Sequence, residues 1–176
     1  MTRSRPSSPS GERGAVWMRI KGLTDEDLVN YKLPSMFIIT NSCTFKCDLE
    51  NGESCCQNSS LAKQKSAVVD DDVIIKRYLQ NPITKAIVFG GLEPFDQYQE
   101  LYEFIARLRI DFACNDDVVI YTGYRYNEIE GELAMLMLFD NIVVKFGRYR
   151  PNIKPRFDEV LGVTLASENQ YALRIS

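Results

Sequence analysis

The sequence contains no histidine, and this absence removes several kinds of enzyme chemistry. Without imidazole there is no Ser-His or Cys-His nucleophile, no histidine metal ligand and no imidazole general base. Any chemistry in this chain therefore depends on thiolates, carboxylates, lysine, tyrosine or a bound cofactor.

The chain also lacks a large excess of either charge, and it lacks a long apolar run. Its 21 basic and 24 acidic residues give a formal net charge of -3, so no basic surface for nucleic acid or anionic membranes is expected. Apolar runs such as residues 134–139 are far shorter than the roughly 20 residues that cross a bilayer. We expect a soluble protein whose partners include neither nucleic acid nor a membrane.

The N-terminal residues lack the apolar segment of a secretion signal. They are rich in Ser, Pro, Gly and Arg, a composition that favours disorder, so residues 1–17 are predicted to be a disordered leader. Residues 18–176 then form a single domain, because this length suits one hydrophobic core. Without a secretion signal we expect a cytoplasmic location, in which the five cysteines stay reduced.

Segments with the pattern of strands and of helices alternate along the chain. Short apolar runs predict strands at residues 36–40, 86–91, 117–124, 141–147, 160–165 and 171–175. Amphipathic spacing predicts helices at residues 70–81, 96–110 and near 127–138. This alternation is typical of an α/β fold with a mainly parallel sheet and crossover helices. Ligands of such sheets lie beyond the carboxyl ends of the strands, where the turns after the first four strands are expected to meet.

Apolar residues on two of the predicted helices are expected to face the core. In the helix at 70–81 these residues are Val73, Ile74, Tyr78 and Leu79. In the helix at 96–110 they are Leu101, Phe104, Ile105 and Leu108. Both sets follow the helical repeat, so we interpret them as packing residues without a chemical role.

Four of the five cysteines lie between residues 43 and 56, directly after the first predicted strand. Cys43 and Cys47 are separated by three residues, whereas Cys55 and Cys56 are adjacent. Because adjacent cysteines do not easily bind one tetrahedral metal together, we expect three ligands from this loop. Three thiolates can hold an iron–sulfur cluster that leaves one iron open to a ligand. A structural zinc site is the alternative, and the isolated Cys114 is interpreted as a buried free thiol.

Several motifs, taken in order over residues 36–175, together resemble the radical S-adenosylmethionine (SAM) superfamily. They are Cys-x3-Cys, a later "CQN", the turn "GGLEP", the strand end "YTGY" and a terminal "SENQ". Within the superfamily the chain looks like the small activating proteins of anaerobic ribonucleoside-triphosphate reductase. It differs from them in having eight residues, not the usual two, before the third cysteine. It also lacks their early Gly-Pro-Gly segment.

The resemblance implies a partial (β/α) barrel that holds a 4Fe-4S cluster and SAM. Cys43, Cys47 and Cys56 are the implied metal ligands, since Cys56 directly precedes the Gln-Asn pair and Cys55 is then its neighbour. The residues implied to bind SAM are Gly90, Gly91, Glu93, Tyr121, Thr122 and Gly123. No catalytic acid or base is implied.

Each of these segments also has a purely structural interpretation. "GGLEP" is equally a turn from strand to helix, with Pro94 near the helix start and Asp96 as its cap. Tyr121 and Thr122 suit an ordinary strand end, and "SENQ" suits a turn between two short strands. Lys145, Arg148 and Arg150 face either a carboxylate of SAM or of a partner, or simply solvent, which is the commoner place for such charges.

The activity implied by the resemblance is that of a glycyl-radical activating enzyme, an oxidoreductase. The cluster, reduced by a donor such as flavodoxin, cleaves SAM to a 5'-deoxyadenosyl radical. That radical generates a glycyl radical on the large subunit of an anaerobic ribonucleotide reductase. Two alternatives stay open: a radical SAM enzyme with another substrate, and a non-enzymatic module that binds zinc or an iron–sulfur cluster.

Overall fold

The computed structural model describes Gly14 and residues 16–176. The predicted leader therefore lies almost wholly outside the described residues, although its last residue, Trp17, already belongs to the first strand. Within the described part of the chain, no helix is both long and apolar enough to cross a membrane.

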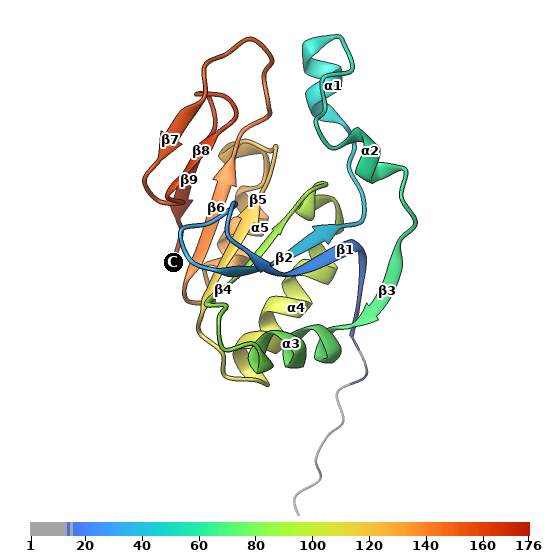
Figure 1. Ribbon diagram of the computed structural model, residues 1–176, viewed down its shortest axis with the longest axis vertical. Coiled ribbons are helices and arrows are strands. Elements are labelled where there is room, and N and C mark those ends of the chain that lie inside the picture. Colours follow the sequence, from blue (N-terminus) through green and yellow to red (C-terminus); the bar gives the residue numbers. More distant parts are fainter. Residues whose placement is uncertain (1–13, 15) are drawn as a thin grey trace, which may run out of the picture.

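A seven-stranded mixed sheet forms the centre of the fold (Figure 1). In spatial order its strands are β3 (Ala67–Asp70), β1 (Trp17–Asp27), β2 (Ser35–Thr40), β4 (Ala86–Gly90), β5 (Asp117–Tyr121), β6 (Ile142–Phe146) and β9 (Tyr171–Arg174). The neighbours β2, β4, β5 and β6 are parallel. The outer strands β1, β3 and β9 pair antiparallel with their neighbours. A separate antiparallel pair is formed by β7 (Arg156–Asp158) and β8 (Val163–Leu165).

The four parallel strands are the part of the sheet that the sequence predicted most directly. Each is a short apolar run, and β4 and β6 are buried at every position, as expected when both faces of a sheet are covered. We expected a mainly parallel sheet, and the observed sheet is mixed because three antiparallel strands flank the parallel ones. The partial barrel stays a prediction.

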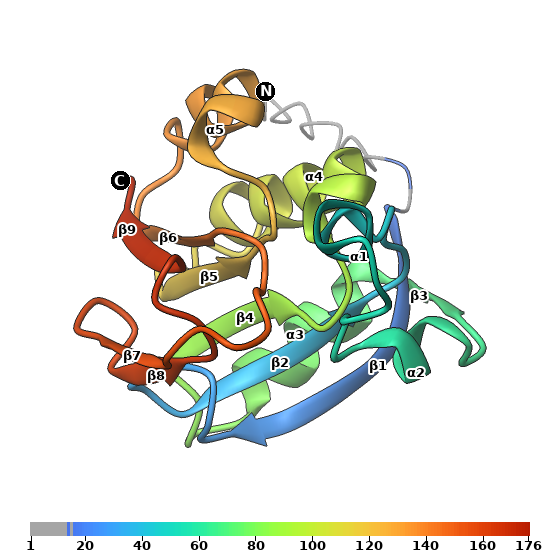
Figure 2. The same ribbon diagram turned by 90° about the horizontal axis from the view of Figure 1, so that it is seen from above.

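Helices cover one face of the sheet and the β7–β8 pair lies on the other (Figure 2). The helical elements after β3 are α3 (Asp71–Gln80), the 3-10 turn η1 (Pro94–Gln97), α4 (Tyr98–Ile110), the 3-10 turn η2 (Tyr126–Glu128) and α5 (Glu130–Leu136). The larger hydrophobic core lies between these helices and the sheet. A smaller one, with Tyr31, Leu161 and Leu165, lies on the opposite face.

The two helices with clear sequence patterns are found where they were predicted. The side chain of Asp70 caps α3 by accepting a hydrogen bond from the Asp72 backbone N–H at 2.9 Å. Leu101, Phe104, Ile105 and Leu108 of α4 are buried as predicted. In α3 the buried residues are Asp71, Ile74, Ile75 and Tyr78. The expectation for Val73 and Leu79 was wrong: they are 58% and 46% exposed, because they lie outside the face of the helix that packs on the core.

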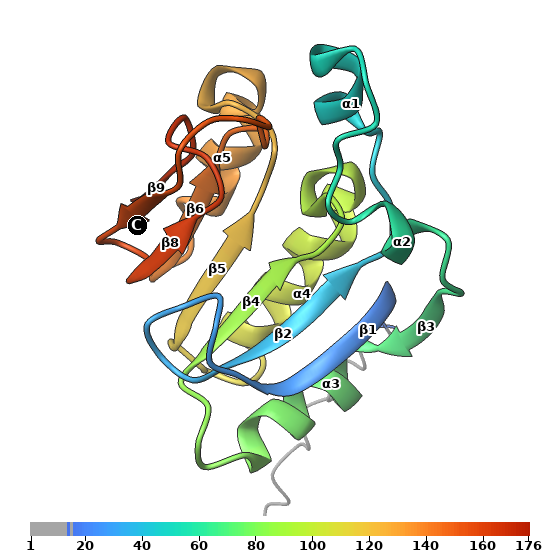
Figure 3. The same cartoon turned by 45° about the horizontal axis from the view of Figure 1, so that its top comes forward.

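Residues 41–66, which connect β2 to β3, form the cysteine loop. It contains two short helices that were not predicted, α1 (Lys46–Asn51) and α2 (Ser59–Ala62). In Figure 3 the arrowheads of β2, β4 and β5 point toward the end of the molecule that carries this loop. The loop is thereby placed over the carboxyl ends of the parallel strands.

Candidate functional site

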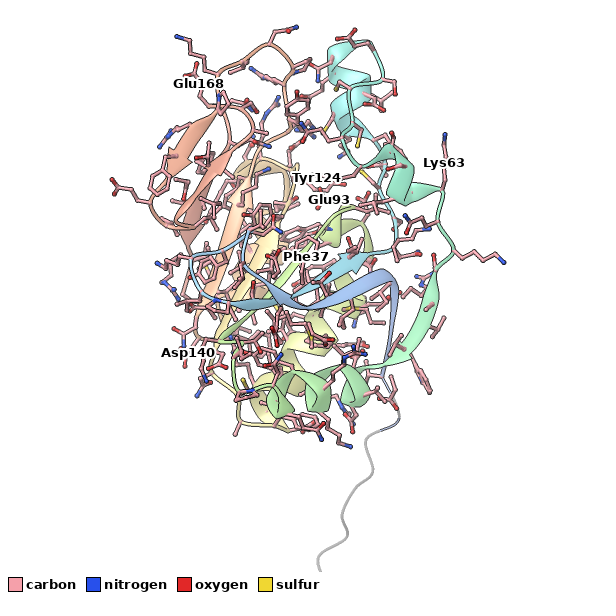
Figure 4. All side chains as sticks on the ribbon, viewed as in Figure 1. Phe37, Lys63, Glu93, Tyr124, Asp140 and Glu168 are labelled. Carbon is pink, nitrogen blue, oxygen red and sulfur yellow. The ribbon has the colours of Figure 1, made fainter. Side chains whose placement is uncertain are left out.

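A pocket with a volume of about 400 Å³ lies at the carboxyl ends of the parallel strands. We call it the cluster pocket. Its lining includes residues of the cysteine loop, of the turn after β4, of the ends of β5 and β6, and of the segment around β8. The turn after β4 is joined to the cysteine loop, since the Glu93 N–H donates to the carbonyl oxygen of Ser42 at 2.8 Å. Figure 4 labels Glu93 and Tyr124 in this region.

Cys43, Cys47 and Cys56 all line the cluster pocket. Cys55 does not line it. Its thiol instead accepts a hydrogen bond from the Asn51 side-chain amide at 3.3 Å and donates to the Cys47 carbonyl oxygen at 3.6 Å. The two adjacent cysteines therefore have different surroundings, and Cys56 is the one that shares the pocket lining with Cys43 and Cys47.

Asp48 holds the backbone of the adjacent cysteines. Its Oδ1 atom accepts hydrogen bonds from the N–H groups of Cys55 at 2.9 Å and of Cys56 at 2.8 Å. Gly52 closes α1 in a left-handed conformation with a φ of 70°. The extra residues before the third cysteine are thus a folded helical turn. Asp48 was not predicted from the sequence. The only signal that could have marked it is the acidic character of a residue in the first turn of a helix.

Burial favours the protonated form of the Cys43 and Cys47 thiols when no metal is bound. Burial raises the pKa of Cys43 to about 12, although the Phe45 N–H, 3.3 Å from its sulfur, opposes the shift. Burial also raises the pKa of Cys47, against the positive charges of Lys145 and Arg148. Metal binding must therefore release these protons.

The described residues contain no group of three or more Cys, Asp or Glu side chains arranged to hold one metal ion. Ligands of a single zinc ion each lie about 2.3 Å from it and so converge on one point. The thiolates of a cubane cluster each bind a different iron, which places them further apart. The sulfur atoms of Cys43, Cys47 and Cys56 line one pocket but are not arranged around one metal ion.

Glu93 is a buried carboxylate in the wall of the cluster pocket, with 6% of its surface exposed. It accepts hydrogen bonds from the Thr122 hydroxyl at 2.7 Å, from the Gly123 N–H at 2.8 Å and from the Phe95 N–H at 3.1 Å. Burial raises its pKa to about 7, and these hydrogen bonds oppose the shift. Glu93 also caps η1, whose first residue is Pro94. The cap is therefore Glu93 and not Asp96, the residue that the sequence had suggested. The "GGLEP" segment both begins a helical turn and forms part of the pocket wall.

Two basic residues near the end of β6 are buried. Lys145, 7% exposed, lines the cluster pocket and donates to the Gly147 carbonyl oxygen at 3.0 Å. Burial lowers its pKa to about 8, and the charges of Glu93 and Cys47 oppose this. The side chain of Arg148 is 4% exposed. The interpretation that such charges are solvated was wrong for these two residues and right for Arg150, which is exposed.

The predicted glycines have different surroundings. Gly91 and Gly123 line the cluster pocket, whereas Gly90 lies behind its wall. A Cβ atom on Gly90 would lie 3.2 Å from the Phe37 ring and from the Tyr121 Cβ atom, so its absence makes room for these two side chains. A Cβ atom on Gly123 would lie 3.5 Å from the Glu93 carboxylate and 3.8 Å from the Cys47 sulfur. The space beside Gly123 therefore borders both a thiol and a carboxylate.

Tyr121 and Thr122 both line the cluster pocket. The Tyr121 hydroxyl donates to the Asn30 carbonyl oxygen at 2.5 Å, which fixes its ring against the pocket wall. From the terminal "SENQ" segment, Gln170 also reaches this pocket and donates to the Gly147 carbonyl oxygen at 3.2 Å. The Gln170 N–H bonds to the Ser167 carbonyl oxygen at 3.0 Å, so the segment is a turn as well.

Comparison with known proteins bears on the metal that this pocket takes. A family model described as a 4Fe-4S single cluster domain matches residues 35–168. The matched segment covers more than half of the 176 residues and contains the cysteine loop and all four parallel strands. No curated protein and no solved structure matches the chain. The chain therefore belongs to the family of 4Fe-4S single cluster domains.

Proposed function

We propose that this protein is a radical SAM enzyme whose 4Fe-4S cluster is held by Cys43, Cys47 and Cys56. The observation that carries the proposal is that these three thiols line one pocket together with Gly91 and Glu93. Membership of a 4Fe-4S family supports a cluster over the structural zinc alternative.

The residues of the pocket suit such a cluster. Three thiols from one loop supply three ligands, which leaves one iron of a four-iron cluster without a protein ligand. Lys145 and Arg148 place positive charge near Cys47 and favour its thiolate form. Gly123 lines the pocket together with Cys47 and Glu93, and the absence of a side chain at Gly123 leaves its edge of the pocket open to a ligand.

A cluster held by these cysteines would supply the one electron that cleaves the sulfonium C–S bond of SAM to methionine and a 5'-deoxyadenosyl radical. Glu93 is placed to accept a hydrogen bond from the SAM ammonium group, because its carboxylate borders the space beside Gly123. Lys145 is the cation available to the SAM carboxylate, as its buried amine lines the same pocket. Burial excludes water from both groups and so strengthens their interaction with a charged ligand.

The proposed reaction is the formation of a glycyl radical on the large subunit of an anaerobic ribonucleotide reductase. The resemblance to activating proteins supports this choice. A large partner that covers the cluster pocket, a reductant such as flavodoxin and a cytoplasmic location complete the proposal.

The first experiment is reconstitution of the full chain with iron and sulfide under anaerobic conditions. We expect a brown protein with about four iron and about four sulfide per chain. Adding dithionite and SAM should then release 5'-deoxyadenosine. A colourless protein with stoichiometric zinc would contradict the proposal. Cluster formation without 5'-deoxyadenosine would instead leave an iron–sulfur module that does not cleave SAM.

The adjacent cysteines provide a matched pair of variants. Cys56→Ala should abolish cluster assembly, because it removes a thiol that lines the pocket. Cys55→Ala should leave most of the iron bound, because the Cys55 thiol bonds to Asn51 and to the Cys47 carbonyl instead. Iron content and visible absorption measure both effects. The opposite pattern would show that Cys55 is the third ligand.

A further inference from the structure

A second pocket, with a volume of about 350 Å³, adjoins the cluster pocket. We call it the arginine pocket, because Arg125, Arg148 and Arg150 line it. Gly147 lines both pockets, so they share a wall. Arg148 also connects them, since it lines the arginine pocket and its Cγ atom lies 3.6 Å from the Cβ position of Gly123, which lines the cluster pocket.

The arginine pocket carries a local excess of positive charge in a chain whose net charge is -3. Arg148 pairs with Glu128 through two bonds of 2.9 Å and 2.8 Å, and with Glu50 at 3.3 Å. Arg125 pairs with the same Glu50 at 3.2 Å. Three arginines thus face two carboxylates, and among the described residues Arg150 forms no ion pair. One positive charge is left for an anionic ligand.

Two residues of the pocket lining also hold a polar atom without a partner. Among the described residues, Nε of Arg148 and Oδ1 of Asn169 are buried and make no hydrogen bond. Because both atoms are closed to solvent, a ligand in the pocket does not reach them in this conformation. The binding argument therefore rests on the exposed charge of Arg150 and on the aromatic rings of the lining.

Two tyrosines complete the wall of the arginine pocket. Tyr126 and Tyr171 line it, and both rings contact Phe146, with centroids 5.7 Å and 5.4 Å apart. Packing against a fully buried phenylalanine holds these rings in place. Rigid tyrosines beside arginines are the composition of protein-binding surfaces.

We propose that the arginine pocket binds an acidic segment of a partner polypeptide and so guides the adjoining backbone of that partner into the cluster pocket. This inference rests on the proposed function, because it assigns a docking site to the protein substrate. The charge of Arg150 recruits the segment, and the rings of Tyr126 and Tyr171 supply the surface on which it packs. Because the two pockets share a wall at Gly147, a partner segment bound in the arginine pocket lies next to the cluster pocket.

The test is calorimetric titration of the reconstituted full chain with three probes. They are the capped pentapeptide Gly-Asp-Gly-Glu-Gly, its amide counterpart Gly-Asn-Gly-Gln-Gly, and glutarate as a small dicarboxylate. We expect the acidic peptide to bind about tenfold more tightly than either of the other probes. Equal affinity for the two peptides would overturn the charge argument. Glutarate binding as tightly as the acidic peptide would overturn the assignment to a polypeptide.

Charge reversal at two exposed arginines locates the binding. Arg150→Glu should weaken the acidic peptide about tenfold, because like charges then meet in the pocket. Arg156→Glu is the matched control, since Arg156 is exposed on β7 and lines neither pocket. Equal weakening by both variants would overturn the proposal. Release of 5'-deoxyadenosine without any partner tests the proposed function separately, so the two failures are distinguishable.

Discussion

Adding one methyl group at Gly123 tests whether a ligand occupies the space between thiol and carboxylate. A Cβ atom there would lie 3.5 Å from the Glu93 carboxylate, 3.6 Å from Arg148 Cγ and 3.8 Å from Cys47 Sγ. These are ordinary van der Waals distances, and Gly123 does not have a positive φ. The protein can therefore fold with alanine at this position.

The expected loss of SAM affinity follows from placing an extra methyl group in the space that bound SAM would occupy. One extra methyl group in such a place costs about 1–3 kcal/mol. Since about 1.4 kcal/mol is tenfold in affinity, Gly123→Ala should weaken SAM binding between about 5-fold and about 150-fold. The free energy of unfolding should change by less than about 1 kcal/mol, because alanine fits the folded backbone.

Two measurements check this prediction, namely equilibrium dialysis of SAM against reconstituted protein and urea unfolding. Gly131→Ala is the control, because it lies in α5 and a Cβ atom there meets no atom within 4 Å. The control should bind SAM normally and gain up to about 1 kcal/mol in stability from the better helix propensity of alanine. If Gly123→Ala bound SAM as tightly as the wild type, the ligand would not pass between Cys47 and Glu93, and the reasoning would fail.

Two further perturbations address the cysteine loop and the core. Asp48→Ala should destabilise the metal-free protein by about 2 kcal/mol and lower its iron content after reconstitution, since two backbone N–H groups lose their acceptor; unchanged iron would show that the loop needs no such support. Asp71, whose two buried carboxylate oxygens have no partner among the described residues, has its pKa raised to about 7 by burial. Because the folded-state pKa exceeds the ordinary aspartate value of 3.8, protonation stabilises the fold, and this stabilisation is lost as the pH rises toward and through 7. Relative to Asp71→Asn, the wild type should therefore lose about 2–3 kcal/mol of unfolding free energy between about pH 5 and about pH 8. Parallel stability curves for the two proteins would refute this.

The sequence predicted the elements whose burial leaves a periodic pattern. The run at 36–40 is found as β2, Ser35–Thr40, and the helix at 70–81 as α3, Asp71–Gln80. The short helices α1 and α2 contain no buried residues, so no apolar repeat marked them. In β3 the side chain of Val68 is 62% exposed, as on an edge strand, and again no alternation was visible.

The candidate site was predictable where it depends on residue type and strand order. The strand ends brought Glu93 and Thr122 beside the cysteine loop because parallel strands end at one edge. The burial of Arg148 was not predictable, since its guanidinium is buried by pairing with Glu128 and Glu50, which lie far from it in the sequence. Charged side chains are usually exposed, so composition alone indicates the opposite.

The two hydrogen bonds accepted by one oxygen of Asp48 also bear on how relatives of this protein are recognised. They fold the longer segment between the second and third cysteines back on itself. More residues between two cysteines in the sequence therefore need not mean a greater distance between their thiols. A search pattern that demands fixed intervals would discard such chains. One that allows an acidic residue directly after the second cysteine, paired with a variable gap, would retain them.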